Sequence, residues 1–72
     1  MTDDELELEI VSEMHVFMPG AEYAVCCITL KSGYSFTGGH GEGVSAAGFD
    51  RVACLKVARQ QAKDLARRTV RP

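Results

Sequence analysis

Six of the seven glycines of this 72-residue chain lie between residues 33 and 50, in the stretch GYSFTGGHGEGVSAAGFD. Glycine at this density can cradle a phosphate or let the backbone pass close to a ligand. A P-loop requires a Gly-Lys-Ser/Thr step, and its lysine is absent here. Residues 41 to 46 match the loose dinucleotide pattern G-x-G-x-x-A, but the chain is too short for the doubly wound sheet in which that pattern acts. We therefore predict a tightly turning sheet edge that leads into a helix, and no cofactor.

The cysteines and histidines are the other residues that could do chemistry. Cys26 and Cys27 are adjacent on a predicted strand, so their side chains point to opposite faces and cannot chelate one ion together. A metal site made of Cys26, Cys54 and one histidine stays open, although a small buried thiol is the commoner state of such residues. A nucleophilic pair of Cys27 and His40 is conceivable across a hairpin, but no third orienting group accompanies it. We expect no catalytic residue, no metal site and no enzymatic activity.

The charged residues divide the chain into an acidic part and a basic part. Residues 1 to 49 carry eight acidic residues and one basic residue, a net charge of −7, whereas residues 50 to 72 carry seven basic and two acidic residues, a net charge of +5. The two parts either neutralise each other within the fold, which we favour, or present faces of opposite sign to partners. The candidate partner-binding residues are Asp3, Asp4, Glu7 and Glu13; the candidate nucleic-acid-binding residues are Arg59, Lys63 and Arg67.

Residues 3 to 14 are predicted to form the helix that carries the acidic candidates. Thr2 and Glu5 have the spacing of a capping box, and acidic residues suit the first turn of a helix. Residues 5 to 10 also alternate as a strand would, which is the competing prediction. The pair Pro19–Gly20 then predicts a turn. The apolar stripe of this helix comprises Leu6, Ile10, Met14 and Phe17.

A hairpin is predicted next. Residues 22 to 31 form its first strand, with Cys26 facing the core, and residues 34 to 37 return after the loop Lys31–Ser32–Gly33. In this register Ile28 lies opposite Phe36, and Leu30 opposite Tyr34. A third short strand near residues 41 to 44 is an alternative that would make Gly38–Gly39 a turn or a bulge.

The final helix is predicted to begin at Ser45 or Asp50, either of which could cap it, and to end near Thr69. We place Cys54 off its main stripe. The order of elements predicts one α+β domain over residues 1–72, a small antiparallel sheet with an N-terminal and a C-terminal helix packed on one face and lying side by side. The apolar stripe of the final helix comprises Phe49, Val52, Leu55, Ala58, Ala62, Leu65 and Ala66.

The bulk composition is that of a globular protein, with 46% hydrophobic and 25% charged residues. No apolar run is long enough to cross a membrane, and the acidic N-terminus is unlike a signal peptide. An odd number of cysteines fits reduced thiols. We therefore expect a cytoplasmic protein that does not contact a membrane.

Residues 22 to 68 loosely resemble the double-stranded-RNA-binding domain, in the order strands, G-x-G-x-S and a basic, alanine-rich helix. In that domain a basic cluster at the start of the second helix contacts phosphates across the major groove. The matching place here is SAAGFD, residues 45 to 50, which has no lysine pair, and Asp50 would repel phosphate. Nucleic-acid binding through the last helix is therefore the alternative function.

A closer resemblance covers about residues 18 to 66. Met18-Pro19-Gly20, the segment VCCITLKSGY (25 to 34), and Phe49-Asp50 before an alanine-rich helix resemble a small family of tailed-phage proteins, typified by proteins of coliphage N-four and Shigella phage Sf-six. The chain lacks the proline usually found after the serine that precedes Phe-Asp, and it ends in RRTVRP rather than an aromatic tail.

The phage resemblance implies a small non-structural phage or prophage protein made in the cytoplasm of a bacterial host. Proteins of that kind commonly bind and occlude a host or anti-phage-defence protein, and an anti-CRISPR role is one specific form of this. A small homodimeric structural protein is a further alternative, because so small a core gains from association.

Overall fold

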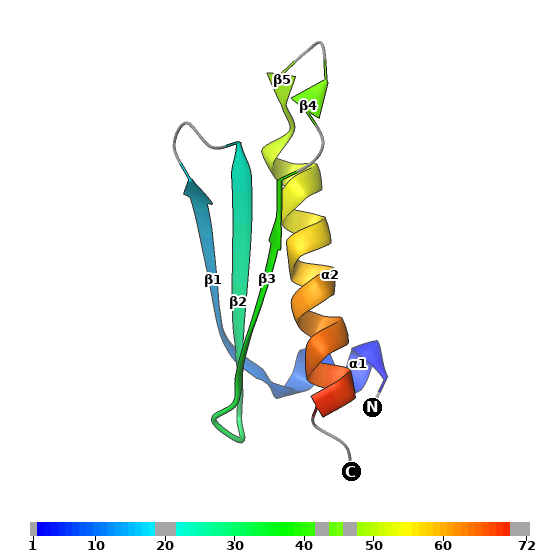
Figure 1. Ribbon diagram of the computed structural model, residues 1–72. Coiled ribbons are helices and arrows are strands. Elements are labelled where there is room, and N and C mark those ends of the chain that lie inside the picture. Colours follow the sequence, from blue (N-terminus) through cyan, green and yellow to red (C-terminus); the bar gives the residue numbers. More distant parts are fainter. Residues whose placement is uncertain (1, 19–21, 42–43, 46–47, 70–72) are drawn as a thin grey trace.

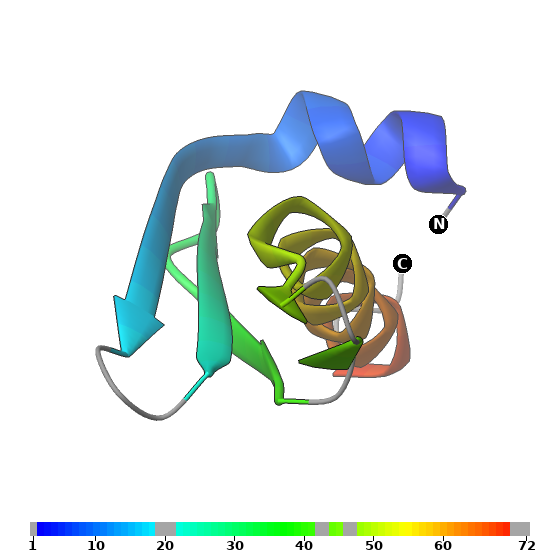
Figure 2. The same cartoon turned by 90° about the horizontal axis from the view of Figure 1, so that it is seen from above.

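The computed structural model describes residues 2–18, 22–41, 44–45 and 48–69. Strand β2 is the centre of an antiparallel sheet of order β1-β2-β3, and β4 and β5 form a separate two-stranded ladder (Figure 1). Helix α2 packs on one face of the sheet, and α1 lies beside α2 on the same side (Figure 2). The predicted α+β architecture is thus confirmed. The elements are α1 (Asp3–Glu9), β1 (Ile10–Met18), β2 (Tyr23–Leu30), β3 (Ser35–His40), β4 (Val44–Ser45), β5 (Gly48–Phe49) and α2 (Arg51–Thr69).

The N-terminal helix is shorter than predicted. Its capping box is confirmed: Thr2 Oγ1 accepts from the backbone N–H of Glu5 at 3.2 Å, and Glu5 Oε1 accepts from the N–H of Thr2 at 3.4 Å. The helix ends at Glu9, because Ile10 is extended (φ −75°, ψ 117°) and begins the strand that pairs with β2. The prediction of a helix to residue 14 is wrong, and Glu13 lies on β1. The predicted turn at Pro19–Gly20 is outside the described residues.

The predicted hairpin loop and register are confirmed. Gly33 has a φ of +95°, which favours glycine, and its N–H donates to the carbonyl of Leu30 at 2.9 Å. The N–H of Leu30 donates to the carbonyl of Tyr34 at 2.9 Å, and Ile28 lies opposite Phe36.

Strand β3 continues through Gly38 and Gly39, so the predicted turn or bulge at this pair is wrong. The third strand of the sheet is β1, on the other side of β2, and the strand considered near residues 41 to 44 does not join the sheet: β4 pairs with β5.

Small residues bring α2 very close to β3. A Cβ atom added at Gly38 would lie 1.9 Å from the carbonyl oxygen of Ala58 and 2.8 Å from the amide nitrogen of Ala62. The buried face of α2 is accordingly made of Cys54, Ala58, Ala62 and Ala66, together with Lys63.

Two members of the predicted stripe of α2, and the placement of Cys54 off that stripe, therefore need correction. Val52 is 68% exposed and Leu65 is 46% exposed, whereas Cys54 is buried instead of lying off the stripe. At so close an approach the contact face accepts small side chains, and the larger ones are turned to its margins. The side chain of Phe49 is outside the described part of the chain.

The core lies between α2 and the face of the sheet that carries the even-numbered residues of β2. Leu6 anchors α1 in this core and Ile10 is partly buried against it. Met14, which belongs to β1, is 58% exposed and does not pack in the core. Asp50 caps α2, because its Oδ1 accepts from the N–H of Ala53 at 3.1 Å. No helix in the described part of the chain is long and apolar enough to cross a membrane. The buried cluster comprises Leu6, Cys26, Ile28, Leu30, Phe36, Ala58, Ala62 and Ala66.

Candidate functional site

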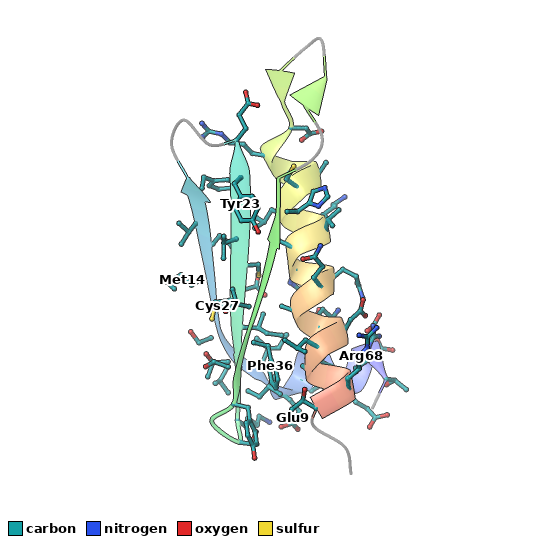
Figure 3. The ribbon with its side chains drawn as sticks, in the orientation of Figure 1. Glu9, Met14, Tyr23, Cys27, Phe36 and Arg68 are labelled. Carbon is teal, nitrogen blue, oxygen red and sulfur yellow. The ribbon has the colours of Figure 1, made fainter. Side chains whose placement is uncertain are left out.

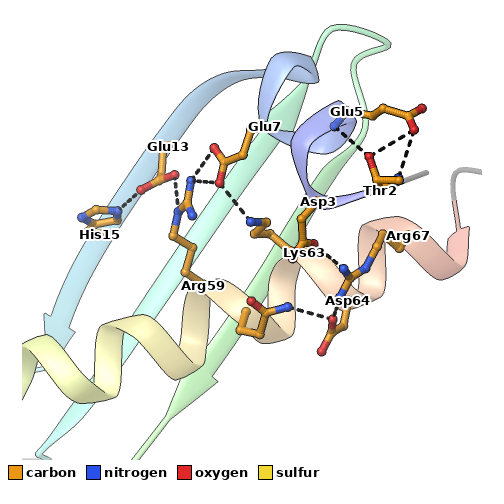
Figure 4. Close-up of polar contacts among 11 residues, drawn as sticks. Thr2, Asp3, Glu5, Glu7, Glu13, His15, Arg59, Lys63, Asp64 and Arg67 are labelled. Atoms are coloured by element: carbon orange, nitrogen blue, oxygen red, sulfur yellow. Dashed lines mark hydrogen bonds and ion pairs between the residues drawn. The ribbon is translucent and has the colours of Figure 1, made fainter.

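Ion pairs join most of the acidic candidates to the basic candidates (Figure 4). Lys63 Nζ donates to Glu7 Oε1 at 2.9 Å. Arg59 Nη2 donates to Glu7 Oε2 at 2.8 Å, and Arg59 Nε donates to Glu13 Oε1 at 2.9 Å. Arg67 bonds to Asp3 and to Asp64. The structure therefore brings together six of the seven candidate residues, and they bind one another.

Residue spacing explains this ion-pair network, which comprises Asp3, Glu7, Glu13, Arg59, Lys63 and Arg67. The three basic residues are four positions apart on α2 and form one stripe along it. Asp3 and Glu7 have the same spacing on α1, which lies beside that stripe, and β1 contributes Glu13. Asp4 is exposed and forms no ion pair with any described residue. Whether any of these residues contacts a partner stays a prediction.

The network is held in its charged form by its own hydrogen bonds. The bond from Lys63, followed by that from Arg59, lowers the pKa of Glu7 below its ordinary value. Burial pushes the pKa of Glu13 upward, but the bonds from Arg59 and His15 outweigh it, so this pKa is also lowered. The bond to Glu13 raises the pKa of Arg59. Lys63 is the member most withdrawn from water, with its side chain 8% exposed.

One group of potential metal ligands lies beside the network. Glu13, His15 and Cys26 place donor atoms within 4.8 Å of one another, and this is the one such group of three among the described residues. It includes Cys26 and a histidine, as the open metal alternative required, but not Cys54. Two features oppose a cation there: burial raises the pKa of the Cys26 thiol, and the Arg59 guanidinium is bonded to Glu13. We therefore assign no metal to this group.

Cys27 and His40 do not form a nucleophilic pair. Cys27 lies opposite Thr37, whereas His40 lies opposite Ala24. Ala24 is buried on the side of the sheet that faces α2, and Cys27 points to the other side. The two side chains therefore lie on opposite faces, and this pairing is corrected.

The glycine-rich stretch has a packing role in its described part. On one face of β3, Gly38 allows the approach of α2. On the other face, the Tyr23 ring lies across Gly39 and Gly41, since an added Cβ atom would lie 2.2 Å from Tyr23 Oη at Gly39 and 2.7 Å from Tyr23 Cδ2 at Gly41. The glycines thus accept a helix on one side and an aromatic ring on the other.

The face of the sheet opposite α2, here called the outer face, is covered by no other element of the described chain. It bears the odd-numbered residues of β2 and their cross-strand partners. Figure 3 shows Met14 and Tyr23 among its side chains. Met14 is 58% exposed, and Cys27 beside it is half-buried. The apolar side chains of the outer face are Met14, Val16, Tyr23, Val25 and Cys27.

Only part of the outer face could be predicted from the sequence. Cys27 was placed on the face opposite the core-facing Cys26, but Met14 was assigned to a helix over residues 3 to 14, and no strand was predicted at Val16. The β-branched residues Ile10, Val11 and Val16 were the signal for a strand there. No family model, curated protein or solved structure matches the chain. The candidate surfaces are therefore the ion-pair network and the outer face, and the assignment of a binding surface rests on their geometry.

Proposed function

We propose that this protein is a non-enzymatic protein-binding module that contacts its partner through the outer face. The observation that carries the proposal is a contrast between the two surfaces. The acidic and basic candidates already bind one another, whereas the outer face exposes an apolar strip that the described chain leaves uncovered. Exposed apolar patches of this kind mark interaction sites more often than isolated apolar residues do.

The ion-pair network is the weaker docking surface. A basic partner would have to displace Arg59 and Lys63 from Glu7, and nucleic acid would have to displace Glu7 from the same two cations. Each exchange replaces one set of charged hydrogen bonds by another, so its net gain is small. Asp4 alone among the acidic candidates is outside the network.

The biological setting proposed for this module is that of a phage or prophage accessory protein in the cytoplasm of a bacterial host. Its support is the order of Met18-Pro19-Gly20, the paired Cys26–Cys27 before a glycine hairpin, and Phe49-Asp50 before the last helix. A module of this size can occlude a host or anti-phage-defence protein, because a standard interface takes about 800 Å² from each partner. Inhibition of a CRISPR effector is one specific form of such occlusion.

Nucleic-acid binding is the second candidate. The element order helix, three antiparallel strands and helix agrees with the double-stranded-RNA-binding domain that the sequence resembles. Affinity for duplex RNA would then fall steeply as salt rises, because contacts to phosphate release counterions. We expect only weak, non-specific binding at physiological salt; a tight gel shift abolished by Arg59→Glu together with Lys63→Glu would favour this candidate instead.

The decisive experiment compares Thr37→Lys with Asp4→Asn in a tagged protein used to capture partners from lysate of a bacterial host. Thr37 is exposed on the outer face of β3, opposite Cys27 of the central strand, so a lysine there disturbs docking without entering the core. We expect wild type and Asp4→Asn to retain the same host protein and Thr37→Lys to lose it, with unchanged thermal unfolding in all three. Retention by Thr37→Lys and loss by Asp4→Asn would move the binding surface to α1.

A further inference from the structure

Strand β1 is the least covered strand of the three-stranded sheet. Residues 11 to 17 are all exposed, and they include Val11 (60%), Met14 (58%), Val16 (38%) and Phe17 (36%). Helix α2 packs over β2 and β3, and β1 stands to one side of it (Figure 2). The outer face of this nine-residue strand is therefore open to water, whereas its inner face meets α2 through the bond of Arg59 to Glu13 and the contact of Arg51 with Phe17.

The outer edge of β1 is open as well. On β3, by contrast, the N–H of Gly39 donates to Gln61 Oε1 of α2 at 3.2 Å, so a helix side chain occupies one position of that edge. Strand β1 pairs with β2 on one side and has no strand on its other side in the described chain. The pairing of β1 with β2 shifts register only near the start of β1, between Ile10 and Ser12. A long edge with exposed apolar side chains is a template for pairing with another strand.

We propose that β1 pairs antiparallel with β1 of a second copy of this chain, about a twofold axis at Met14. Around this axis each residue lies opposite the residue equally far on the other side of Met14. Glu13, an acid, then lies opposite His15 of the partner subunit, a base. The twofold axis generates this pair twice, once on each side of Met14. An antiparallel ladder can be centred on one residue in either hydrogen-bonding phase, so the backbone of β1 satisfies this register.

The register is also consistent with the faces of the strand. Met14 would meet Met14 of the partner subunit on the outer face, with Ser12 opposite Val16 of the partner subunit on either side. Glu13 and His15 lie on the other face, within 2.5 Å of each other and with Arg59 bonded to Glu13. The dimer would thus have one six-stranded sheet, with Met14 paired at the axis on one face and Glu13 opposite His15 of the partner subunit on the other. It does not depend on the proposed protein partner.

The first test compares Met14→Lys with Thr37→Lys by sedimentation equilibrium at micromolar to sub-millimolar concentration. The two positions flank Cys27 on the same face, on β1 and β3, and both are exposed, so they form a matched pair. We expect wild type and Thr37→Lys to sediment as dimers. Met14→Lys places two like charges opposite each other at the axis, so its dissociation constant should rise at least about tenfold. A monomeric wild type, or dissociation by Thr37→Lys alone, would overturn the proposal.

A second test fixes the register without relying on a destabilising variant. Met14→Cys is made in a Cys27→Ser background, so that no neighbouring thiol competes, and is oxidised under mild conditions. Cα atoms opposite each other in an antiparallel pair are close enough for a disulfide. We expect a covalent dimer on a non-reducing gel from Met14→Cys and none from Thr37→Cys in the same background. Equal cross-linking at both positions, or at neither, would contradict the axis at Met14.

A third measurement tests the charge pairing. His15→Glu sets two carboxylates opposite each other on each side of the axis, whereas His15→Lys sets a lysine opposite Glu13 there. Dimerisation should weaken about tenfold in His15→Glu at low salt, less so as salt rises, and should be retained in His15→Lys. Equal effects of the two variants would exclude this register. Because Thr37→Lys should lose the captured host protein yet stay dimeric, failure of this proposal is distinguishable from failure of the proposed function.

Discussion

The two edge strands of the sheet pair with the same central strand but are attached to the rest of the fold differently. Strand β3 lies beneath α2, with Phe36 6% exposed and Gly38 in backbone contact with the helix. Strand β1 reaches α2 through polar and aromatic contacts: Glu13 binds Arg59 at 2.9 Å, and the Arg51 guanidinium lies 5.5 Å from the centre of the Phe17 ring.

The two edge strands are held by different kinds of contact: β3 by close packing and β1 largely by exposed charged groups. Close packing of small residues excludes water and tolerates little change in shape. Exposed charge pairs tolerate substitution, contribute less, and are weakened by salt. Stability should therefore be concentrated on the β3 side, while the β1 side stays available for contacts with other molecules.

The largest effect is expected from Gly38→Ala. The added Cβ atom would meet the Ala58 carbonyl at 1.9 Å, and because this neighbour is backbone, the helix itself must shift. We expect a loss of about 3 kcal/mol or more in the free energy of unfolding, measured by urea denaturation. Gly39→Ala is the matched control: the Tyr23 ring, at 2.2 Å, is the flexible end of a side chain that is 38% exposed and can move aside. Equal losses in the two variants would mean that the backbone contact of Gly38 with α2 is no more restrictive than the contact of Gly39 with the Tyr23 ring.

An intermediate effect is expected at Cys26, which lies on β2 between the two edge strands, opposite His15 on β1 and Gly38 on β3. Cys26 is fully buried, so Cys26→Ser places a hydroxyl in the core and should lower the free energy of unfolding by about 2 kcal/mol. Cys27→Ser, on the half-buried outer face, should change it by less than about 0.5 kcal/mol. Thermal melting of both variants measures the two losses. A larger loss in Cys27→Ser than in Cys26→Ser would mean that Cys27, and not Cys26, faces the core.

Features with a local cause could be predicted from the sequence. The capping box at Thr2, the Gly33 hairpin loop with Ile28 opposite Phe36, and the Asp50 cap each depend on residues a few positions apart. The ion-pair partners were foreseen more coarsely. Opposite charge in the two halves favoured neutralisation, but the pairing of Glu13 with Arg59 depends on a strand that was predicted to be a helix.

Features that depend on distant parts of the chain could not be predicted. Residues 10 to 14 satisfy a helical stripe as well as a strand, and pairing with β2 decides between them. The buried face of α2 was predicted from its large apolar residues, but the approach of Gly38 selects small ones, which buries Cys54 and exposes Val52. The same misassignment of β1 concealed Met14 and its part of the outer face.

The smallest effect is expected from Glu7→Gln, which removes the carboxylate that binds Lys63 and Arg59 on the β1 side of the fold. Because the Glu7 side chain is 42% exposed, solvent screens these pairs, and we expect a loss of only about 0.5–1 kcal/mol near neutral pH. Asp4→Asn, at an exposed position outside the network, is the control and should leave the free energy of unfolding unchanged.

Acid and salt identify the origin of the Glu7 effect. The pKa of Glu7 is lowered in the folded state from an ordinary value of 4.5, chiefly by the hydrogen bond from Lys63. A lowered pKa contributes stability that is present above 4.5 and is lost as the pH falls through the lowered value. The difference between wild type and Glu7→Gln should therefore shrink on acidification below about pH 4.5 and also in high salt. Chemical denaturation at several pH values measures it, and a difference that stays the same in acid and in high salt would mean that Glu7 acts through packing, as Gly38 does, so that the two sides of the sheet would be held alike.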